Sequence, residues 1–173
     1  PGAGGGWRLG RALGRRRGGV GRLLRLVEVG VGLIPGGGGL TYIARRAAEA
    51  AAAAPGTDLL GFLKEGFTAA AMAKVGTSAL ESRKLGYLLD SDVIVANKDE
   101  LLHVALTQVK ALAETGYRAP PKAMFQVAGR NGIATIKSSL VGMRDGGFIS
   151  AHDFHIAGLI ADVVCGGEVD AGS

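Results

Sequence analysis

A proline followed by four consecutive glycines, Pro35 to Gly39, constrains this chain more than any other feature of its sequence. Glycine adopts backbone conformations that other residues avoid, and it lets a second segment approach closely. A single carboxylate, Glu28, and a short apolar stretch precede the glycines, and a helical pattern begins directly after them. The run Val27–Leu40 therefore predicts a tight turn that holds a charged group beside a closely approaching segment or ligand.

The composition divides the chain in two near residue 26. Residues 1–26 contain seven arginines, nine glycines and no acidic side chain. The other residues carry 13 of the 20 basic side chains against 15 acidic ones, so the net charge of +5 comes from the first segment. We expect residues 1–26 to be disordered, because they offer too few apolar side chains to bury.

The 173 residues are enough for one ordinary domain with a sizeable core. The single cysteine, Cys165, excludes an internal disulfide framework, so we expect a reducing, cytoplasmic setting. No apolar stretch is long enough for a membrane helix, and the arginine-rich start is not a signal peptide.

His152 and His155 are three residues apart, but no third metal ligand is near them in the sequence. We expect the two histidines to cap or line the last helix, and we expect no metal site.

Hydrophobic periodicity and capping signals predict a mostly helical chain with little sheet. Residues 29–34 are expected either as a short buried strand or as an extended approach to the glycine turn. The best strand candidate is Asp92–Ala96. The tail Cys165–Ser173 is short and polar and is not an evident folding terminus. Helices are expected over 41–54, 58–74 with Asp58 as N-cap, 78–86 with a Ser78–Glu81 capping box, 98–115 with Asn97 as N-cap, 131–143, and 151–164 with Ser150 and Asp153 as caps.

Local chemistry alone leaves the role of Glu28 open. A carboxylate at the mouth of a glycine turn can act as a general acid or base when apolar walls surround it. The alternative is a solvated glutamate at a strand edge, since charged side chains are mostly exposed. The glycines do not form a nucleotide-binding loop, because no Gly-Lys-Ser/Thr follows and the spacing after Gly30 misses the dinucleotide fingerprint.

The run from Glu28 to Gly39 resembles the second active-site motif of the enoyl-CoA hydratase/isomerase (crotonase) superfamily. In that motif a catalytic glutamate precedes a hydrophobic–glycine stretch, Ile-Pro and a glycine-rich turn into a helix. Thr77–Leu88 is similar to a later segment of the family. Val27–Ser173 as a whole resembles the C-terminal crotonase region of bacterial multifunctional 3-hydroxyacyl-CoA dehydrogenase/enoyl-CoA hydratase proteins of fatty-acid β-oxidation. The fold class that this resemblance implies is α/β, a partial crotonase-like (ββα spiral) fold that is predominantly helical in this fragment.

The resemblance implies hydration of a 2-enoyl-CoA, in which water adds across the C2=C3 bond while backbone N–H groups hold the thioester oxyanion. Glu28 falls on the glutamate that exchanges the proton at the α-carbon. Gly36 falls on the turn residue that helps to order the water, and Gly5 falls on one oxyanion donor. Acyl-CoA would be the substrate, and no cofactor is expected in this chain, because NAD would belong to an absent dehydrogenase domain. The residues expected to bind the substrate are Leu33, Ile34 and Pro35.

Arg8 stands where the family has its first catalytic glutamate, although Gly4–Gly6 keep the register. A GC-rich gene that is translated in the wrong reading frame yields sequence that is rich in Arg and Gly and has no acidic residues. Residues 1–26 are therefore interpreted either as such a product or as a real tail. The expected organisation is a Gly/Arg-rich segment over 1–26, the C-terminal half of a crotonase-like domain over 27–116, and a helical C-terminal extension over 117–173. This chain alone is expected to show little or no activity.

Two other functions stay open. One is a catalytically inactive crotonase-like module that packs against further copies of this chain or against a missing half of the same enzyme. The other is nucleic-acid binding through the arginines of residues 8–25, which could contact several phosphates. Trp7 is the only aromatic residue in or next to that segment that could stack on a base, so nucleic acid is the less favoured partner.

Overall fold

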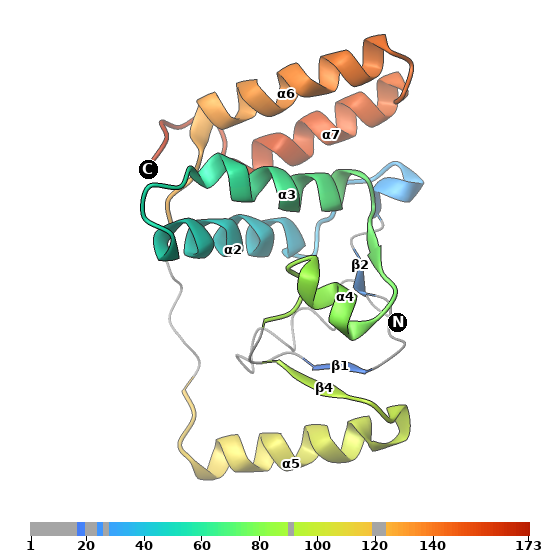
Figure 1. Cartoon of the computed structure of the whole chain (residues 1–173), viewed down its shortest axis with the longest axis vertical. Coiled ribbons are helices and arrows are strands. Elements are labelled where there is room, and N and C mark those ends of the chain that lie inside the picture. Colours follow the sequence, from blue (N-terminus) through green and yellow to red (C-terminus); the bar gives the residue numbers. More distant parts are fainter. Residues whose placement is uncertain (1–16, 20–23, 26–27, 90–91, 119–123) are drawn as a thin grey trace. The chain divides into compact units, whose positions relative to one another are not determined.

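The computed structural model describes all residues except 1–16, 20–23, 26–27, 90–91 and 119–123. The described part is mostly helical with little strand (Figure 1). The chain forms two compact units: unit 1 combines Pro1–Arg25 with Val75–Ala123, and unit 2 combines Leu26–Lys74 with Met124–Ser173. The interpretation of 27–116 as half of a crotonase-like domain and of 117–173 as an extension stays a prediction.

The described part of unit 2 consists of two helical hairpins preceded by a short 3-10 helix. The helices of each hairpin pack against each other, and the last helix also contacts both helices of the first hairpin. These elements are η1 (Glu28–Val31), α2 (Gly39–Ala53), α3 (Leu59–Ala71), α6 (Gly129–Asp145) and α7 (Ala151–Val164). The large buried side chains of this core are Leu40, Ile43, Leu63, Phe67, Ile133, Ile136, Leu140, Ile156, Ile160 and Val164.

Unit 1 contains the described strands. The parallel pairing joins β1 (Arg17–Gly19) to β4 (Val93–Val95), and the antiparallel pairing joins β2 (Leu24–Arg25) to β3 (Val75–Gly76). The strand predicted at Asp92–Ala96 is thereby confirmed as β4, whereas most of the 1–26 segment lies outside the described residues. The helical elements of unit 1 are α4 (Ala79–Lys84), η2 (Lys98–Glu100) and α5 (Leu101–Glu114).

A helix forms in each predicted region, with residues 98–100 as a 3-10 turn, and side-chain caps mark the starts of α3, α4 and α7. Asp58 accepts a hydrogen bond from Leu60 N–H at 3.0 Å and starts α3. Ser78 accepts one from Glu81 N–H at 3.1 Å and starts α4. Such caps replace partners that the first N–H groups of a helix lack, and they involve residues two or three positions apart. The sequence alone is therefore enough to place them.

The buried-strand alternative for residues 29–34 is wrong. Glu28–Val31 forms η1, and the side chains of Val31 and Leu33 are 75% and 60% exposed. Two glycines interrupt the apolar residues and weaken any strand face, so a tight turn forms instead. Leu33–Gly36 has no regular secondary structure, which agrees with the alternative of an extended approach to the glycines.

The tail Cys165–Ser173 packs, in contrast to what its sequence indicates. Gly129 N–H donates to Cys165 O at 2.8 Å, and Arg130 N–H donates to Val169 O at 2.9 Å. These carbonyls take the place of a side-chain cap, which α6 lacks because its N-cap residue is an alanine. For this reason α6 begins earlier than its own sequence predicts.

Gly129→Ala should destabilise the protein, whereas Gly142→Ala should stabilise it. Gly129 has φ 58°, and an added Cβ would lie 2.3 Å from Val169 O, so we expect a loss of about 1–3 kcal/mol in the free energy of unfolding. Gly142 lies inside the same helix with open space around it, and alanine there should add about 0.5–1 kcal/mol. Urea unfolding followed by circular dichroism measures both. Equal midpoints for the two variants would contradict the capping role of the tail.

Cys165 should report the opening of unit 2. Burial, with a smaller contribution from the Asp162 carboxylate, raises the pKa of the Cys165 thiol from 9.0 to about 11. The thiolate is the reactive form, so at pH 8 it should be about a hundredfold scarcer than in an exposed cysteine. Because the chain has one cysteine, a disulfide reagent that releases a coloured thiolate measures the reaction of Cys165 alone. Reaction should be slow in native buffer and fast in urea; rapid labelling of the native protein would show that the core around α7 is open.

Candidate functional site

The described site residues of the predicted hydratase lie in one segment of unit 2, residues 28–38, called the Glu28 loop below. Glu28 is the first residue of η1, and Gly36 precedes the start of α2. Of the residues predicted to bind the acyl group, Leu33 and Ile34 are exposed and Pro35 is buried. Gly5 and Arg8 lie outside the described residues.

One oxygen of the Glu28 carboxylate is shielded from solvent. Glu28 Oε2 is buried and has no hydrogen-bond partner among the described residues, although the residue as a whole is half-buried. A buried oxygen without a partner costs free energy, because its hydrogen bonds to water are lost and not replaced. Its lone pairs therefore remain available to accept a hydrogen bond.

A positive φ angle and two backbone hydrogen bonds close the turn after Glu28. Gly32 has φ 75°, and its N–H donates to Val29 O at 2.9 Å. Leu33 N–H donates to Glu28 O, also at 2.9 Å. His152 Nε2 lies 3.0 Å from Gly32 O, and since a carbonyl can only accept, Nε2 must carry the proton. The Glu28 loop is thus joined to α7, 120 residues further along the chain.

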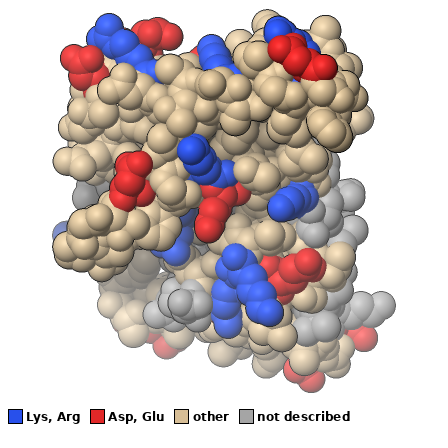
Figure 2. Space-filling view, turned by 45° about the horizontal axis from the view of Figure 1, so that its top comes forward, with Lys and Arg blue, Asp and Glu red and all other residues tan. Residues whose placement is uncertain are grey.

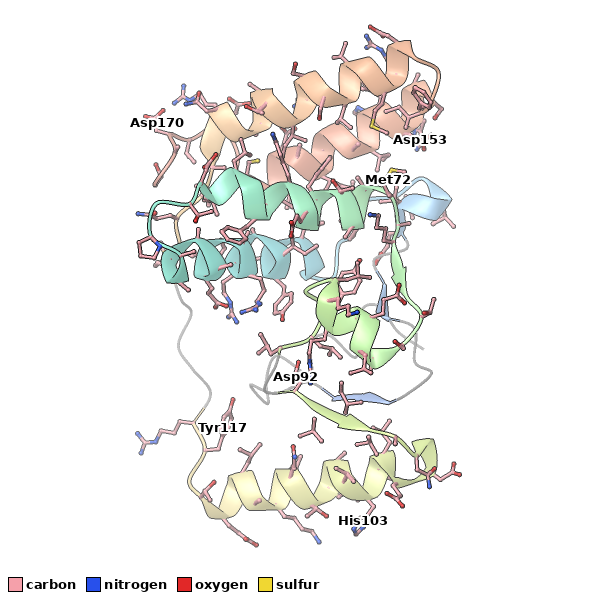
Figure 3. The ribbon with its side chains drawn as sticks, in the orientation of Figure 1. Met72, Asp92, His103, Tyr117, Asp153 and Asp170 are labelled. Atoms are coloured by element: carbon pink, nitrogen blue, oxygen red, sulfur yellow. The ribbon has the colours of Figure 1, made fainter. Side chains whose placement is uncertain are left out.

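The first turn of α7, which carries His152, is held by a capping box. Ser150 Oγ accepts from Asp153 N–H at 3.1 Å, and the Asp153 carboxylate accepts from Ser150 N–H at 3.1 Å and from Ser150 Oγ at 2.7 Å. Asp153 is labelled at this end of α7 in Figure 3. The hydrogen bonds from Ser150 lower the pKa of the Asp153 carboxyl below 3.8, so the box is intact at neutral pH and is lost only as the pH falls below that value. The caps predicted at Ser150 and Asp153 are confirmed.

The sequence did not predict the contact between His152 and Gly32. Its sequence signal is its place next to a capping box, which indicates the start of a helix and gives no information about a partner. The hydrogen bond to Gly32 O depends on how α7 packs against the first hairpin, and no local pattern encodes that packing.

Exposed apolar side chains belong to the same loop. Val31 and Leu33 are among the most exposed large apolar residues of the described chain, and Ile34 is 38% exposed. Exposed apolar groups that neighbour one another commonly mark a surface that binds a ligand or a partner. The Glu28 loop therefore combines a carboxylate with apolar surface, which suits an acyl chain better than a highly polar ligand.

A cavity of about 280 Å³ lies elsewhere in unit 2, near the starts of α3 and α6. The polar side chains that line it are those of Asp58, Gln126, Asn131 and Thr135. No residue of the Glu28 loop lines this cavity, so it is distinct from the predicted site. Asp58 is already used there as the N-cap of α3.

Within the described ranges, no group of three or more His, Cys, Asp or Glu side chains is placed to hold a metal ion. None of the helices that the structure describes combines the length and the apolar character needed to cross a bilayer.

Charged side chains of the described residues are mixed in sign on the face shown in Figure 2. On α2, Arg45 Nε and Arg46 Nη1 pair with the Glu49 carboxylate at 3.0 and 2.8 Å. Between α6 and α7, Lys137 Nζ pairs with Asp162 at 2.7 Å. The nucleic-acid alternative concerns the arginines of residues 8–25, most of which lie outside the described residues, so it stays a prediction.

Gly32→Ala should disturb the Glu28 loop, and Gly30→Ala should not. A Cβ at Gly32 would lie 2.9 Å from His152 Nε2, and the positive φ adds a backbone cost of about 1–2 kcal/mol for alanine. Gly30 has open space around it and no positive φ. We expect Gly32→Ala to shift the NMR signals of the His152 ring and of the loop amides, while Gly30→Ala leaves the ring signals in place. Identical His152 signals in the two variants would contradict the contact with Gly32.

Comparison with known proteins identifies one relative of much greater length. The chain is 39% identical over 153 residues to a probable 3-hydroxyacyl-CoA dehydrogenase of Bacillus subtilis (strain 168). The match covers 86% of this chain and 18% of that protein. No family model matches the chain, and no solved structure matches it. Over most of its length, the chain is therefore similar to a short part of a longer protein whose name places it in 3-hydroxyacyl-CoA metabolism.

Proposed function

We propose that this chain is part of an enzyme that acts on acyl-CoA thioesters in fatty-acid β-oxidation, and that its own site hydrates 2-enoyl-CoA. The observation that carries the proposal is the 39% identity, over 86% of the chain, to a protein named as a 3-hydroxyacyl-CoA dehydrogenase. Hydration of a 2-enoyl-CoA yields a 3-hydroxyacyl-CoA, which is the class of compound in that name. A hydratase site and a dehydrogenase site would thus catalyse consecutive steps on the same acyl group.

The chemistry assigned to the Glu28 loop is proton transfer at the α-carbon. One O–H bond of the water would break, its oxygen would bond to C3, and its proton would pass by way of the Glu28 carboxylate to C2, while the double bond between C2 and C3 becomes a single bond. Glu28 would deliver the proton to C2, and the buried, unpartnered Oε2 supports this role because no intramolecular hydrogen bond has to break first. A Cβ added at Gly36 would meet nothing within 4 Å, which leaves space for the reacting water beside the backbone.

The remaining parts of the proposed site rest on the resemblance to crotonases. The N–H group of Gly5 would be one oxyanion donor, and Leu33 and Ile34 would lie along the acyl chain. The complete enzyme domain would have a crotonase-like fold. The described part of this chain, which is mostly helical, does not conflict with a fragment of such a fold. Arg8 stands in place of the family's first catalytic glutamate, and a guanidinium cannot accept a proton from water, so this chain should be a slow catalyst.

Hydration of crotonyl-CoA, followed by the loss of enoyl-thioester absorbance, tests the role of Glu28. Glu28→Gln keeps the shape of the side chain but removes the acid, and it should lower any measured rate by about 10²–10⁴-fold. Glu65→Gln changes an exposed glutamate on α3 and should leave the rate unchanged. Equal rates for the wild type and Glu28→Gln would exclude Glu28 as the acid or base.

Arg8→Glu gives the complementary gain-of-function test. The variant supplies the missing carboxylate at the position that keeps the glycine register, so the rate should rise by about 10²-fold or more. Arg8→Gln removes the positive charge without adding a base and serves as the matched control. If neither the wild type nor Arg8→Glu hydrates crotonyl-CoA, the hydratase proposal fails for this chain and an inactive crotonase-like module is favoured.

A further inference from the structure

We propose that His152, on the first turn of α7, is a positioning residue that sets the orientation of the Gly32–Leu33 peptide group and, through it, the backbone of Glu28. The role in catalysis rests on the function proposed above, whereas the contact itself is a property of the fold. The contact is the 3.0 Å approach of His152 Nε2 to Gly32 O.

The Gly32–Leu33 peptide group connects the histidine to the catalytic candidate. The oxygen of this peptide group accepts the hydrogen bond from His152, and its N–H, which is the N–H of Leu33, donates to Glu28 O at 2.9 Å. A peptide group is planar and its oxygen and N–H point in opposite directions, so fixing one end fixes the other. His152 and the backbone of Glu28 are therefore the two partners of one rigid group.

Gly32 makes this peptide group unusually dependent on an outside contact. Its φ of 75° lies in a region that glycine enters freely, but glycine also leaves that region freely. The turn is therefore not locked by local sterics, as a proline or a β-branched residue would lock it. The hydrogen bond from His152 supplies a restraint that the loop sequence does not.

The helix that presents His152 is well fixed. The capping box between Ser150 and Asp153 holds the turn that contains it, and Ile156 and Ala157 on the next turn are buried in the core. Phe154 packs against the same core, and the Arg144 guanidinium lies 4.6 Å from the centre of its ring. A side chain on such a helix is held in a fixed place relative to the core. Its hydrogen bond can therefore hold a loop in place, as positioning residues in active sites do.

His152 is exposed, so its hydrogen bond contributes little to global stability and its loss should be seen locally. His155 provides a control, because it is an exposed histidine on the same helix. Glutamine carries its terminal amide nitrogen about as far from the backbone as His Nε2, whereas asparagine is one carbon shorter. His152→Gln should therefore keep the contact and His152→Asn should lose it.

Amide hydrogen exchange of the full chain, resolved by NMR, measures the contact without any enzymatic assay. In His152→Asn, exchange of the Leu33 N–H should become about three- to tenfold faster, as expected for the loss of one supporting hydrogen bond. His152→Gln, His155→Asn and His155→Gln should exchange at this position as the wild type does. The Phe154 N–H, which donates to Ser150 O at 3.0 Å, should be unchanged in all four variants and shows that α7 itself is intact.

Two outcomes would overturn the proposal. One is an unchanged Leu33 exchange rate in His152→Asn. The other is equal acceleration by His152→Gln and His152→Asn, which would show that the imidazole matters for a reason other than its Nε2 donor. Hydration rates of the same variants separate this inference from the proposed function. If exchange responds as expected while no variant hydrates crotonyl-CoA, His152 positions the loop and the hydratase assignment is the part that fails.

Discussion

The packing of α7 against both α2 and α3 is the contact on which unit 2 depends. Ile160 and Ala161 on α7 have no exposed surface, and Val164 is 1% exposed. Full burial of a large aliphatic side chain stabilises a fold by about 1.5–3 kcal/mol, whereas a single hydrogen bond contributes a net of about 0.5–1.5 kcal/mol. The apolar contacts of α7 therefore determine the arrangement of unit 2, and the polar contacts at its surface adjust details of loops that are already in place.

This order of strengths explains how the candidate site is assembled. The Glu28 loop precedes α2 in the sequence, while His152 belongs to α7, and the two meet because the helices that carry them share one core. The hydrogen bond to Gly32 O is too weak to bring the two stretches together. It can only select one orientation of a flexible glycine peptide once the hydrophobic core has formed.

The parts of the fold that the sequence predicts are those set by neighbouring residues. Asp58 at the start of α3 and Ser150 at the start of α7 bond to groups two or three residues away, so a pattern of side chains identifies them. The Cys165–Ser173 tail could not be interpreted in this way, because the N–H groups that it caps belong to Gly129 and Arg130. Of the two alternatives for residues 29–34, the buried strand is wrong for the opposite reason, since the glycines favour a local turn over pairing with a sheet partner.

The same distinction applies to the chemistry. The carboxylate of Glu28, the glycines and the apolar residues around them can be read from a short run, and they indicate a kind of reaction. Catalysis also requires that the carboxylate be held within about 0.5 Å of a productive position, which a glycine-rich loop does not achieve alone. The rigidity has to come from an element with its own core contacts, and α7 is such an element. If Glu28 acts as the proposed acid or base, the capping pair Ser150 and Asp153 contributes to its position without touching the substrate, because it holds the turn that carries His152.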